Sequence, residues 1–443
     1  FSIQGKSSIT DGRVSPLVKS TWDQDTVSSK YTYNYYTPNH YVCGCVATAM
    51  SQLMRYHQFP TASRSVVTKT CYVSDVATSL STKAGTYAWS DMPLTPTYTI
   101  TDTQREAIGR LTYDAGVSVR MQYDTTANGG SGAYTLECAD ALKSTFGYAN
   151  GMSHYPATFT TNVINRAVLA NLDAGLPVLF GISGDGGHAI VGDGYGYSSS
   201  KLYVHLNMGW SGYDNAWYNL PIIDCAYTGY NFDTISTIVY NVYTNGTGDL
   251  ITGRIFNESG AVVTGATVRA FQNNTLKATS VTGTNGIYAL RVSISGQNPA
   301  TYNIVASNSY LQATSSVSVA KSVTMTYTTA GQDLYIDTVG TVGNSWGNDM
   351  VLTPISLPTA PTTISATDGT YSNAVVITWS GATAAGSYSV WRGGNSATNS
   401  ASQIASDITD ESYTDTSAAF STGYYYWVKA VNSRGSSDFS TMN

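Results

Sequence analysis

Charged residues are scarce in this chain of 443 residues. Asp, Glu, Lys and Arg make up 11% of it, against roughly 25% in an average soluble protein. The 22 Lys and Arg form no cluster and the net charge is −6, which argues against a nucleic-acid or anionic-membrane partner. No apolar run approaches the ~20 residues that span a bilayer. Polarity comes instead from Ser, Thr, Asn, Gly and 34 Tyr, a composition typical of extracellular proteins rich in strands and turns.

Cysteine is also infrequent, and its count is odd. The five positions are Cys43, Cys45, Cys71, Cys138 and Cys225. In a secreted protein an unpaired thiol needs a reason, and one free nucleophile with up to two disulfides would fit this count. The pairing cannot be deduced from the sequence. The chain starts at Phe1 and shows no signal peptide, so we expect a processed or trimmed chain that a pro-segment preceded.

Residues 1–245 alternate between helical and extended patterns. Apolar residues at helical spacing predict helices at Cys45–His57, Thr103–Ala115, Leu136–Gly147 and Asn162–Ala174. Short segments punctuated by Gly, Ser and Asn predict antiparallel strands at Val178–Gly181, Ala189–Gly192, Tyr203–Leu206 and Trp217–Leu220. Helices followed by a sheet indicate an α+β domain.

The remaining residues contain no helical pattern. In residues 246–330 alternating segments and turns such as Asn285–Gly286 predict a β-sandwich, and the stretches Gly253–Ile255 and Gly283–Tyr288 resemble carboxypeptidase-regulatory-like modules. Residues 331–357 are expected to be a linker or an extended segment. Residues 358–443 alternate with period two, and the spacing of Trp379, Tyr388 and Tyr426 resembles a fibronectin type III domain.

Cys45 is predicted to lie at the N-terminus of the first helix. The helix dipole and free backbone N–H groups there stabilise a thiolate and can receive an oxyanion. A buried structural cysteine or a half-cystine is an equal alternative when Cys45 is considered alone. Cys43 and Cys45 do not predict a zinc site, because no second Cys/His pair follows at zinc spacing.

His188 follows two glycines and opens an apolar strand, which would place its imidazole at the mouth of the strand. A thiol nucleophile needs an adjacent base with a pKa near the working pH, and histidine provides one. A structural histidine at a strand edge is an equal alternative for His188 alone. We expect the other four, His40, His57, His154 and His205, to be structural.

Two polar stretches complete the set of candidate catalytic residues. Asn207 and Trp210 follow His188 and could fix and shield an imidazole, although Asn, Gly and Ser also simply form turns. Gln24 precedes Cys45, and a glutamine amide can donate to an oxyanion. The order Gln, Cys, His, Asn-x-x-Trp is the chain order of papain-like peptidases.

Residues 15 to about 242 resemble the streptopain family of cysteine peptidases. The matching stretches are Pro16–Leu17, Trp22–Gln24, Gly44–Ala49, Met54–His57, Trp89–Pro93, Met121–Tyr123, Phe146–Tyr148, Gly186–Ala189 and Asn207–Gly212. The resemblance covers about half of the chain. It implies an exported bacterial enzyme, secreted or at the cell surface, that is made with an inhibitory N-terminal pro-segment and cleaves protein or peptide substrates without a cofactor or a metal.

The resemblance also implies roles for individual residues. Cys45 would be the nucleophile and His188 its base, Gln24 would complete the oxyanion hole, and Asn207 and Trp210 would flank the imidazole. One departure is Met208, which stands where the family pattern Asn-Trp-Gly-Trp has its first Trp. A second oddity is Cys43, which could pair with Cys71 or be a spare thiol. Residues expected to border the substrate are Met121, Gly130, Ser131 and Gly187.

Two other functions share parts of this pattern. A cysteine-dependent transpeptidase or transglutaminase would use the same nucleophile but pass the acyl group to an amine. An adhesin or binding protein with a decayed catalytic domain would instead act through its sandwich modules. Those modules could bind a surface or matrix partner in either case, since fold alone does not determine function.

Overall fold

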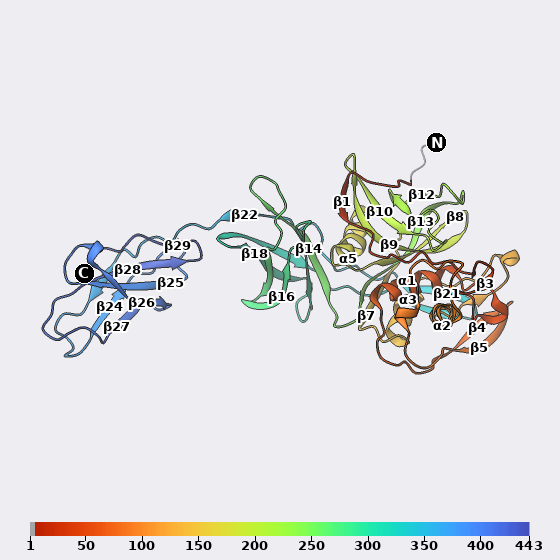
Figure 1. The fold of residues 1–443 in the computed structure, drawn as a ribbon, viewed down its shortest axis with the longest axis horizontal. Helices are drawn as coiled ribbons and strands as arrows, with labels where there is room; N and C mark the ends of the chain where they lie inside the picture. The colour runs from red at the N-terminus through yellow and green to blue at the C-terminus, as the bar shows by residue number, and fades with distance from the viewer. Residues whose placement is uncertain (1–4, 443) are drawn as a thin grey trace. The chain divides into compact units, whose positions relative to one another are not determined.

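The computed structural model describes residues 5–442, which form two compact units. The first unit contains the chain up to Ile255 together with Val262–Ile304 and Ser315–Met350, and the second contains Phe256–Ala261, Val305–Thr314 and Val351–Asn443. Figure 1 shows the elements in chain order. Among the described residues, no helix combines the length and the apolar character needed to cross a bilayer.

The helices of the first unit lie close to the ranges expected from the sequence. They are α1 (Cys45–His57), α2 (Asp102–Ser118), α3 (Glu137–Ser144), α4 (Thr161–Val163) and α5 (Ala170–Asp173). The predicted fourth helix is one continuous helical stretch in which a π-helical segment, Ile164–Leu169, joins α4 to α5. Thr101 caps α2 in a capping box with Gln104.

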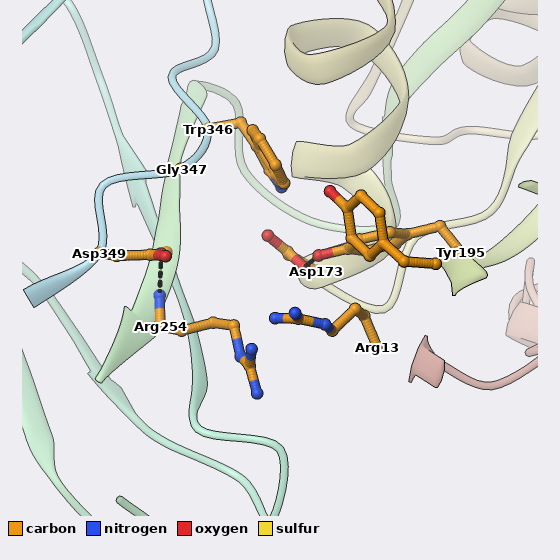
Figure 2. Close-up of a pocket in the computed structure, with 9 residues that line it drawn as sticks. Arg13, Asp173, Tyr195, Arg254, Trp346, Gly347 and Asp349 are labelled. Atoms are coloured by element: carbon orange, nitrogen blue, oxygen red, sulfur yellow. Dashed lines mark hydrogen bonds between the residues drawn. The ribbon is translucent and has the colours of Figure 1, made fainter. Parts of the chain in front are cut away.

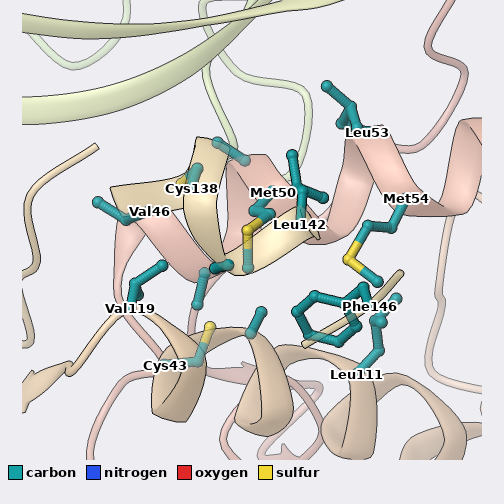
Figure 3. Packing of buried hydrophobic residues seen from close by; sticks show 14 of the residues in the cluster. Cys43, Val46, Met50, Leu53, Met54, Leu111, Val119, Cys138, Leu142 and Phe146 are labelled. Carbon is teal, nitrogen blue, oxygen red and sulfur yellow. The ribbon is translucent and has the colours of Figure 1, made fainter. Parts of the chain in front are cut away.

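A hydrophobic core lies between α1, α2 and α3. Figure 3 shows Met50 and Met54 of α1 pointing to the side on which Leu111 of α2 and Phe146 lie. Every residue of α1 from Val46 to Met54 is buried. The apolar stripe that predicts this helix therefore also fixes the position of its first residue, Cys45.

An eight-stranded sheet makes up the other half of the peptidase-like part. Its strands are β1 (Asp11–Val14), β7 (Asn150–His154), β8 (Val178–Gly184), β9 (Gly187–Ser198), β10 (Lys201–Asn207), β11 (Ala216–Tyr218), β12 (Ile223–Asp224) and β13 (Asn231–Tyr243). The main order is β11-β10-β9-β8-β13-β12, with β1 on β9 and β7 on β13. Its apolar side chains form a second core, and α1 packs against β9.

Two small sheets belong to the helical half. They comprise β2 (Thr26–Val27) with β3 (Lys30–Tyr31), and a sheet of β4 (Thr68–Val73), β5 (Val76–Ser81) and β6 (Gln122–Tyr123). In the latter sheet β4 pairs with β6 in parallel, with Tyr72 opposite Gln122. The isolated bridge between Gln122 and Gly132 extends this sheet by one short segment.

The middle part of the chain is all β, as the sequence predicts. Its strands are β14 (Asp249–Asn257), β15 (Thr267–Gln272), β16 (Thr275–Val281), β17 (Ile287–Val292), β18 (Ala300–Asn308), β19 (Leu311–Val319) and β22 (Met350–Pro354). Strand β14 pairs with β17, and β15 pairs with β16.

Residues 331–357, expected to be a linker or an extended segment, are partly built into the sheets. They contain β22 and also β21 (Asp333–Thr338), which forms a hairpin with β20 (Thr326–Ala330). Between these strands Asn344 is fully buried. Its amide exchanges hydrogen bonds with the Asn241 amide, donating at 2.9 Å and accepting at 3.1 Å. Buried amides with paired donors and acceptors mark a segment that is built into the structure.

Most of the second unit is a two-sheet sandwich. One sheet contains β23 (Ile364–Ala366), β24 (Val375–Trp379) and β27 (Ser412–Asp415), and the other contains β25 (Ser387–Gly393), β26 (Ser402–Ile408), β28 (Tyr425–Asn432) and β29 (Gly435–Ser436). Trp379, Tyr388 and Tyr426 pack in its core. The fold class predicted from the sequence, an α+β papain-like domain followed by two all-β sandwich domains, is confirmed.

Candidate active site

The candidate nucleophile, Cys45, is the first residue of α1. The preceding Gly44 has φ of 89°, a left-handed conformation that favours glycine. A Cβ atom at Gly44 would lie 2.7 Å from the Cε of Met121 and 2.9 Å from the carbonyl oxygen of Ser131. Glycine at position 44 thus lets two neighbouring segments approach the start of the helix.

The Cys45 thiol lies in a setting that can support an anion. Burial raises the pKa of Cys45, and hydrogen bonds from the backbone N–H groups of Ala189, Val46 and Cys45 itself act in the opposite direction. Two of these groups are unpaired donors at the N-terminus of α1. The third belongs to the residue after His188, so the thiol lies against the beginning of β9.

His188 is held in one orientation by two contacts. Its Nε2 lies 2.8 Å from the carbonyl oxygen of Met208, and its ring stacks on Trp210 with centroids 4.4 Å apart and 20° between the planes. A carbonyl can only accept, so Nε2 carries the proton and Nδ1 keeps a free lone pair in the neutral ring. Burial lowers the pKa of His188 to about 4, although the bond to Met208 acts to raise it.

The Asn207 side chain makes its hydrogen bonds with groups other than the imidazole. Its Nδ2 donates to the carbonyl oxygen of Ser20 at 2.7 Å. Its Oδ1 accepts from the Nε2 of Gln52 at 3.0 Å and from the backbone N–H of Gly209 at 3.1 Å. The imidazole is instead bonded by the backbone of the next residue, Met208. Asn207 therefore fixes the turn that presents this carbonyl.

Gln52 is a site residue that the sequence reasoning missed. It is fully buried on α1, and its Oε1 accepts from the Ser20 hydroxyl at 2.9 Å and from the backbone N–H of Trp22 at 3.2 Å. Through its bond to Asn207 it joins the nucleophile helix, the Gln24 segment and the His188 turn. A usable signal was its position seven residues after Cys45, which puts both on one face of a helix.

Gln24 lies next to the nucleophile helix through its backbone. Its carbonyl oxygen accepts from the N–H of Cys43 at 2.9 Å. The neighbouring Asp23 accepts from the hydroxyl of Thr48 on α1 at 3.0 Å and from the hydroxyl of Ser211 at 2.6 Å. The Trp22–Gln24 segment is thus bonded both to α1 and to the loop that carries Trp210.

The residues expected to border a substrate lie near the start of α1 or at the start of β9. Met121 and Ser131 contact Gly44, and a Cβ on Gly130 would touch Val42. Gly187 is exposed and starts β9, and the space where its Cβ would lie is open.

All five cysteines are free thiols, so the disulfides that the odd count allowed are not formed, and of the two alternatives for Cys43 the structure shows the spare thiol and not the pair with Cys71. The Sγ of Cys43 lies 3.3 Å from the hydroxyl of Thr48, and the Sγ of Cys71 donates to the carbonyl oxygen of Val117. Burial raises the pKa of both thiols to about 12. Only Cys45 is partly exposed; the other four are buried.

The other four histidines have partners away from Cys45. His205 lies 2.6 Å from a carboxylate oxygen of Asp193, His57 3.2 Å from the hydroxyl of Tyr148, and His40 and His154 contact backbone carbonyls. These contacts agree with the structural roles expected for them. Among residues 5–442, no group of three or more His, Cys, Asp or Glu side chains could hold a metal ion.

A polar cavity of about 160 Å³ lies elsewhere in the first unit. It is lined by Arg13, Asp173, Tyr195, Tyr197, Gly253, Arg254, Trp346, Gly347 and Asp349. Figure 2 shows the Asp173 carboxylate beside the Tyr195 ring at its centre. The Tyr195 hydroxyl donates to Asp173 at 2.7 Å, and the Thr252 hydroxyl donates at 2.8 Å. Asp173 therefore connects the sheet that carries His188 with β14.

Part of this chain is similar in sequence to known proteins. Residues 22–218 match the model of the Peptidase C10 family. Streptopain of Streptococcus pyogenes is 28% identical over 237 residues, which are 47% of this chain and 57% of streptopain. The thiol protease/hemagglutinin PrtT of Porphyromonas gingivalis is 30% identical over 191 residues, 41% of this chain and 20% of PrtT. This chain thus spans little more than half the length of the streptopain it matches.

A solved structure adds a similarity of limited extent. The active wild-type interpain A cysteine protease of Prevotella intermedia is 30% identical in sequence, with a TM-score of 0.46. The matched region covers 52% of this chain and 95% of interpain A. The matched family residues include Cys45, His188 and Asn207, and they begin at Trp22, just ahead of Gln24. Residues 22–218 of this chain thus match the Peptidase C10 family, and this part of the chain is similar to streptopain-like cysteine peptidases.

Proposed function

We propose that this protein is a cysteine endopeptidase in which Cys45 is the nucleophile and His188 the general base. The observation that carries the proposal is the setting of the Cys45 thiol. Cys45 is the first residue of α1, backbone N–H groups of Val46 and Ala189 act to lower the pKa of its thiol, and Ala189 adjoins a histidine whose Nε2 is already bonded to Met208. A nucleophile with an oriented base and preorganised donors is the arrangement that acyl transfer requires.

In the proposed reaction the thiol proton moves to Nδ1 of His188. The resulting pair is neutral overall, so burial opposes it less than it opposes either isolated charge. The thiolate then attacks the scissile carbonyl carbon, and the oxyanion accepts hydrogen bonds from the Cys45 N–H and the Gln24 amide. His188 returns the proton to the leaving amine, which leaves a thioester on Cys45.

Deacylation uses the same groups in reverse. Water gives a proton to Nδ1 of His188 and attacks the thioester carbonyl, and the Cys45 thiol is released with a carboxylic acid product. Trp210 stacks on the imidazole and shields it from bulk water, and Asn207 and Gln52 hold the Met208 carbonyl that keeps Nε2 protonated. Met121, Gly130, Ser131 and Gly187 would border the bound peptide.

The proposal includes where and how the enzyme acts. Export to the cell surface or the medium, synthesis with an inhibitory pro-segment, and a surface or matrix partner for the β-sandwich modules are all part of it. The streptopain-like family supports the first two, and the low content of charged residues fits an extracellular protein.

The test is hydrolysis of casein under reducing conditions by the wild type, by Cys45→Ala and by Cys225→Ala. Cys225 is a buried thiol and serves as the matched control. We expect cleavage by the wild type and the control, and none by Cys45→Ala or after thiol alkylation. Product that appears only as a conjugate of an added amine would identify an acyltransferase instead, and a folded, inert wild type would favour a binding protein.

A further inference from the structure

A hairpin from the middle of the chain contacts the helical half of the peptidase domain. It consists of β20 and β21, residues 326–338, and we call it the hairpin strap. Figure 1 draws β21 in cyan among the helices α1, α2 and α3. These residues belong to the same compact unit as the peptidase domain, although more than eighty residues separate them from its last strand, β13.

The base of the hairpin strap is attached to the sheet half. The N–H of Met325 donates to the carbonyl oxygen of Ser153 at 2.9 Å. On the other side of the base, Nδ1 of His154 lies 2.8 Å from the carbonyl oxygen of Val339. Ser153 and His154 belong to β7, which pairs with β13 of the large sheet.

The strap then reaches elements of the helical half. The hydroxyl of Tyr327 donates to the carboxylate of Asp140 on α3 at 2.8 Å. At the tip, the Gln122 side chain on β6 donates to the carbonyl oxygen of Gln332 at 3.2 Å. The Gln332 side chain in turn donates to the carboxylate of Asp75 in the β4–β5 turn at 3.1 Å. One hairpin thus bridges both halves that flank Cys45.

The strap tip lies on the outer face of the small sheet. Side chains alternate between the faces of a strand, and in β6 Tyr123 is buried in the core whereas Gln122 is half-buried. Tyr72 stands opposite Gln122, and a Cβ on Gly331 would lie 3.6 Å from the Tyr72 hydroxyl. The tip therefore holds β6 from the side opposite to the core.

A short path of contacts leads from the strap to the nucleophile. Gln332 is bonded to Gln122, the preceding Met121 is buried against Gly44, and Gly44 precedes Cys45. On its free edge, Gln122 also exchanges two backbone hydrogen bonds with Gly132, at 2.9 Å and 3.0 Å. Gly132 follows Ser131, whose carbonyl oxygen also contacts Gly44.

We propose that the hairpin strap is a positioning element of the peptidase, in which Tyr327 anchors the strap to α3 and Gln332 holds β6, so that Met121 and Ser131 form a fixed wall beside Cys45. The strap touches neither reacting group, so it acts on substrate affinity and not on the chemical step. The peptidase domain is accordingly incomplete without a part of the β region that follows it. The effect on affinity rests on the proposed peptidase function, and the effect on β6 does not.

The experiment shortens the strap in the full-length chain. Thr326 and Thr338 are paired across the base, so an Asn-Gly turn can join them and replace residues 327–337. We expect hydrogen exchange of the amides of residues 121–132 to accelerate. We also expect KM for a peptide substrate to rise about tenfold with kcat within about twofold, since two or three modest hydrogen bonds are lost.

Point variants provide a test that does not depend on the folding of the shortened chain. Tyr327→Phe with Gln332→Ala removes the bonds that these two side chains donate to Asp140 and Asp75, and leaves the bond from Gln122 to the Gln332 carbonyl oxygen. Tyr335→Phe, on the same hairpin but 57% exposed, is the matched control. Unchanged exchange in residues 121–132 in a folded, shortened variant would overturn the proposal. Because exchange needs no catalysis, an inactive wild type would reject the peptidase function and still leave the strap tested.

Discussion

The carbonyl oxygen of Met208 lies 2.8 Å from Nε2 of His188 and is the hydrogen-bond partner that fixes the imidazole. A backbone group performs this task, so the identity of the side chain at position 208 does not decide it. Met208 itself is fully buried in the core of the sheet half. The replacement of the family's first Trp by Met therefore leaves the orientation of His188 intact.

Substitution of Asn207 is expected to impair catalysis through this carbonyl. Asn207→Ala removes the bonds to Ser20, Gln52 and Gly209 that shape the turn, so the imidazole loses its fixed partner. We expect kcat to fall by at least tenfold with a smaller change in KM, as for a lost positioning contact. Steady-state kinetics measure this, and a variant with wild-type kcat would show that Met208 holds its position without Asn207.

Gln52 is expected to matter for both stability and activity. Gln52→Leu keeps the approximate volume but leaves the Trp22 N–H, the Ser20 hydroxyl and Asn207 with fewer partners. Loss of a buried hydrogen-bond partner lowers the free energy of unfolding by about 1–3 kcal/mol. Denaturant unfolding should show this loss, and kcat/KM should fall as well. The exposed Gln403→Leu serves as a control, and equal effects of the two changes would contradict the role of Gln52.

Native thiol labelling should select Cys45. It is the partly exposed cysteine, whereas Cys43, Cys71, Cys138 and Cys225 are buried and burial raises their pKa values. Mass spectrometry after brief alkylation at neutral pH should find one label on Cys45, and five labels after unfolding. His188→Ala should slow the labelling at least tenfold if the imidazole accepts the thiol proton. An unchanged rate would argue against His188 as the base.

Asp173 predicts a pH dependence of stability. Burial raises its pKa from 3.8 to about 7, although the hydrogen bonds from the hydroxyls of Tyr195 and Thr252 act to lower it. The folded state then binds the proton more tightly than the unfolded state, so this contribution to stability is full below pH 4 and is lost as the pH rises to about 7. Thermal unfolding should show that the melting temperature of Asp173→Asn rises relative to that of the wild type across this pH window. A difference independent of pH would contradict the assignment.

The sequence predicts the nucleophile helix well because one signal dominates it. The stripe Val46, Ala49, Met50 and Leu53 follows a glycine and ends before Pro60, and α1 has the predicted bounds Cys45–His57. The large sheet is predicted only in part. Strand β13, Asn231–Tyr243, was not predicted because its C-terminal half is buried on both faces and shows no alternation.

Contacts made by backbone groups and by distant segments account for the remaining differences. The partner of His188 is a carbonyl, which every residue possesses, so sequence pattern pointed to the Asn207 side chain instead. Gln52 is polar within an apolar stripe, and its partners come from segments that only the fold brings together. Residues 331–357 show no pattern beyond a linker or an extended segment, yet Asn344 and the hairpin strap have their partners in the peptidase domain.

The reciprocal bond between Asn241 and Asn344 has a consequence for the order of biosynthesis. Asn241 lies near the end of the last strand of the peptidase domain, but Asn344 emerges from the ribosome only after β14 to β21 have been made. Until then the Asn241 amide and the carbonyl oxygen of Arg166, which also accepts from Asn344, lack their buried partner. The nascent domain therefore lacks these buried hydrogen bonds until most of the β region that follows it has been made.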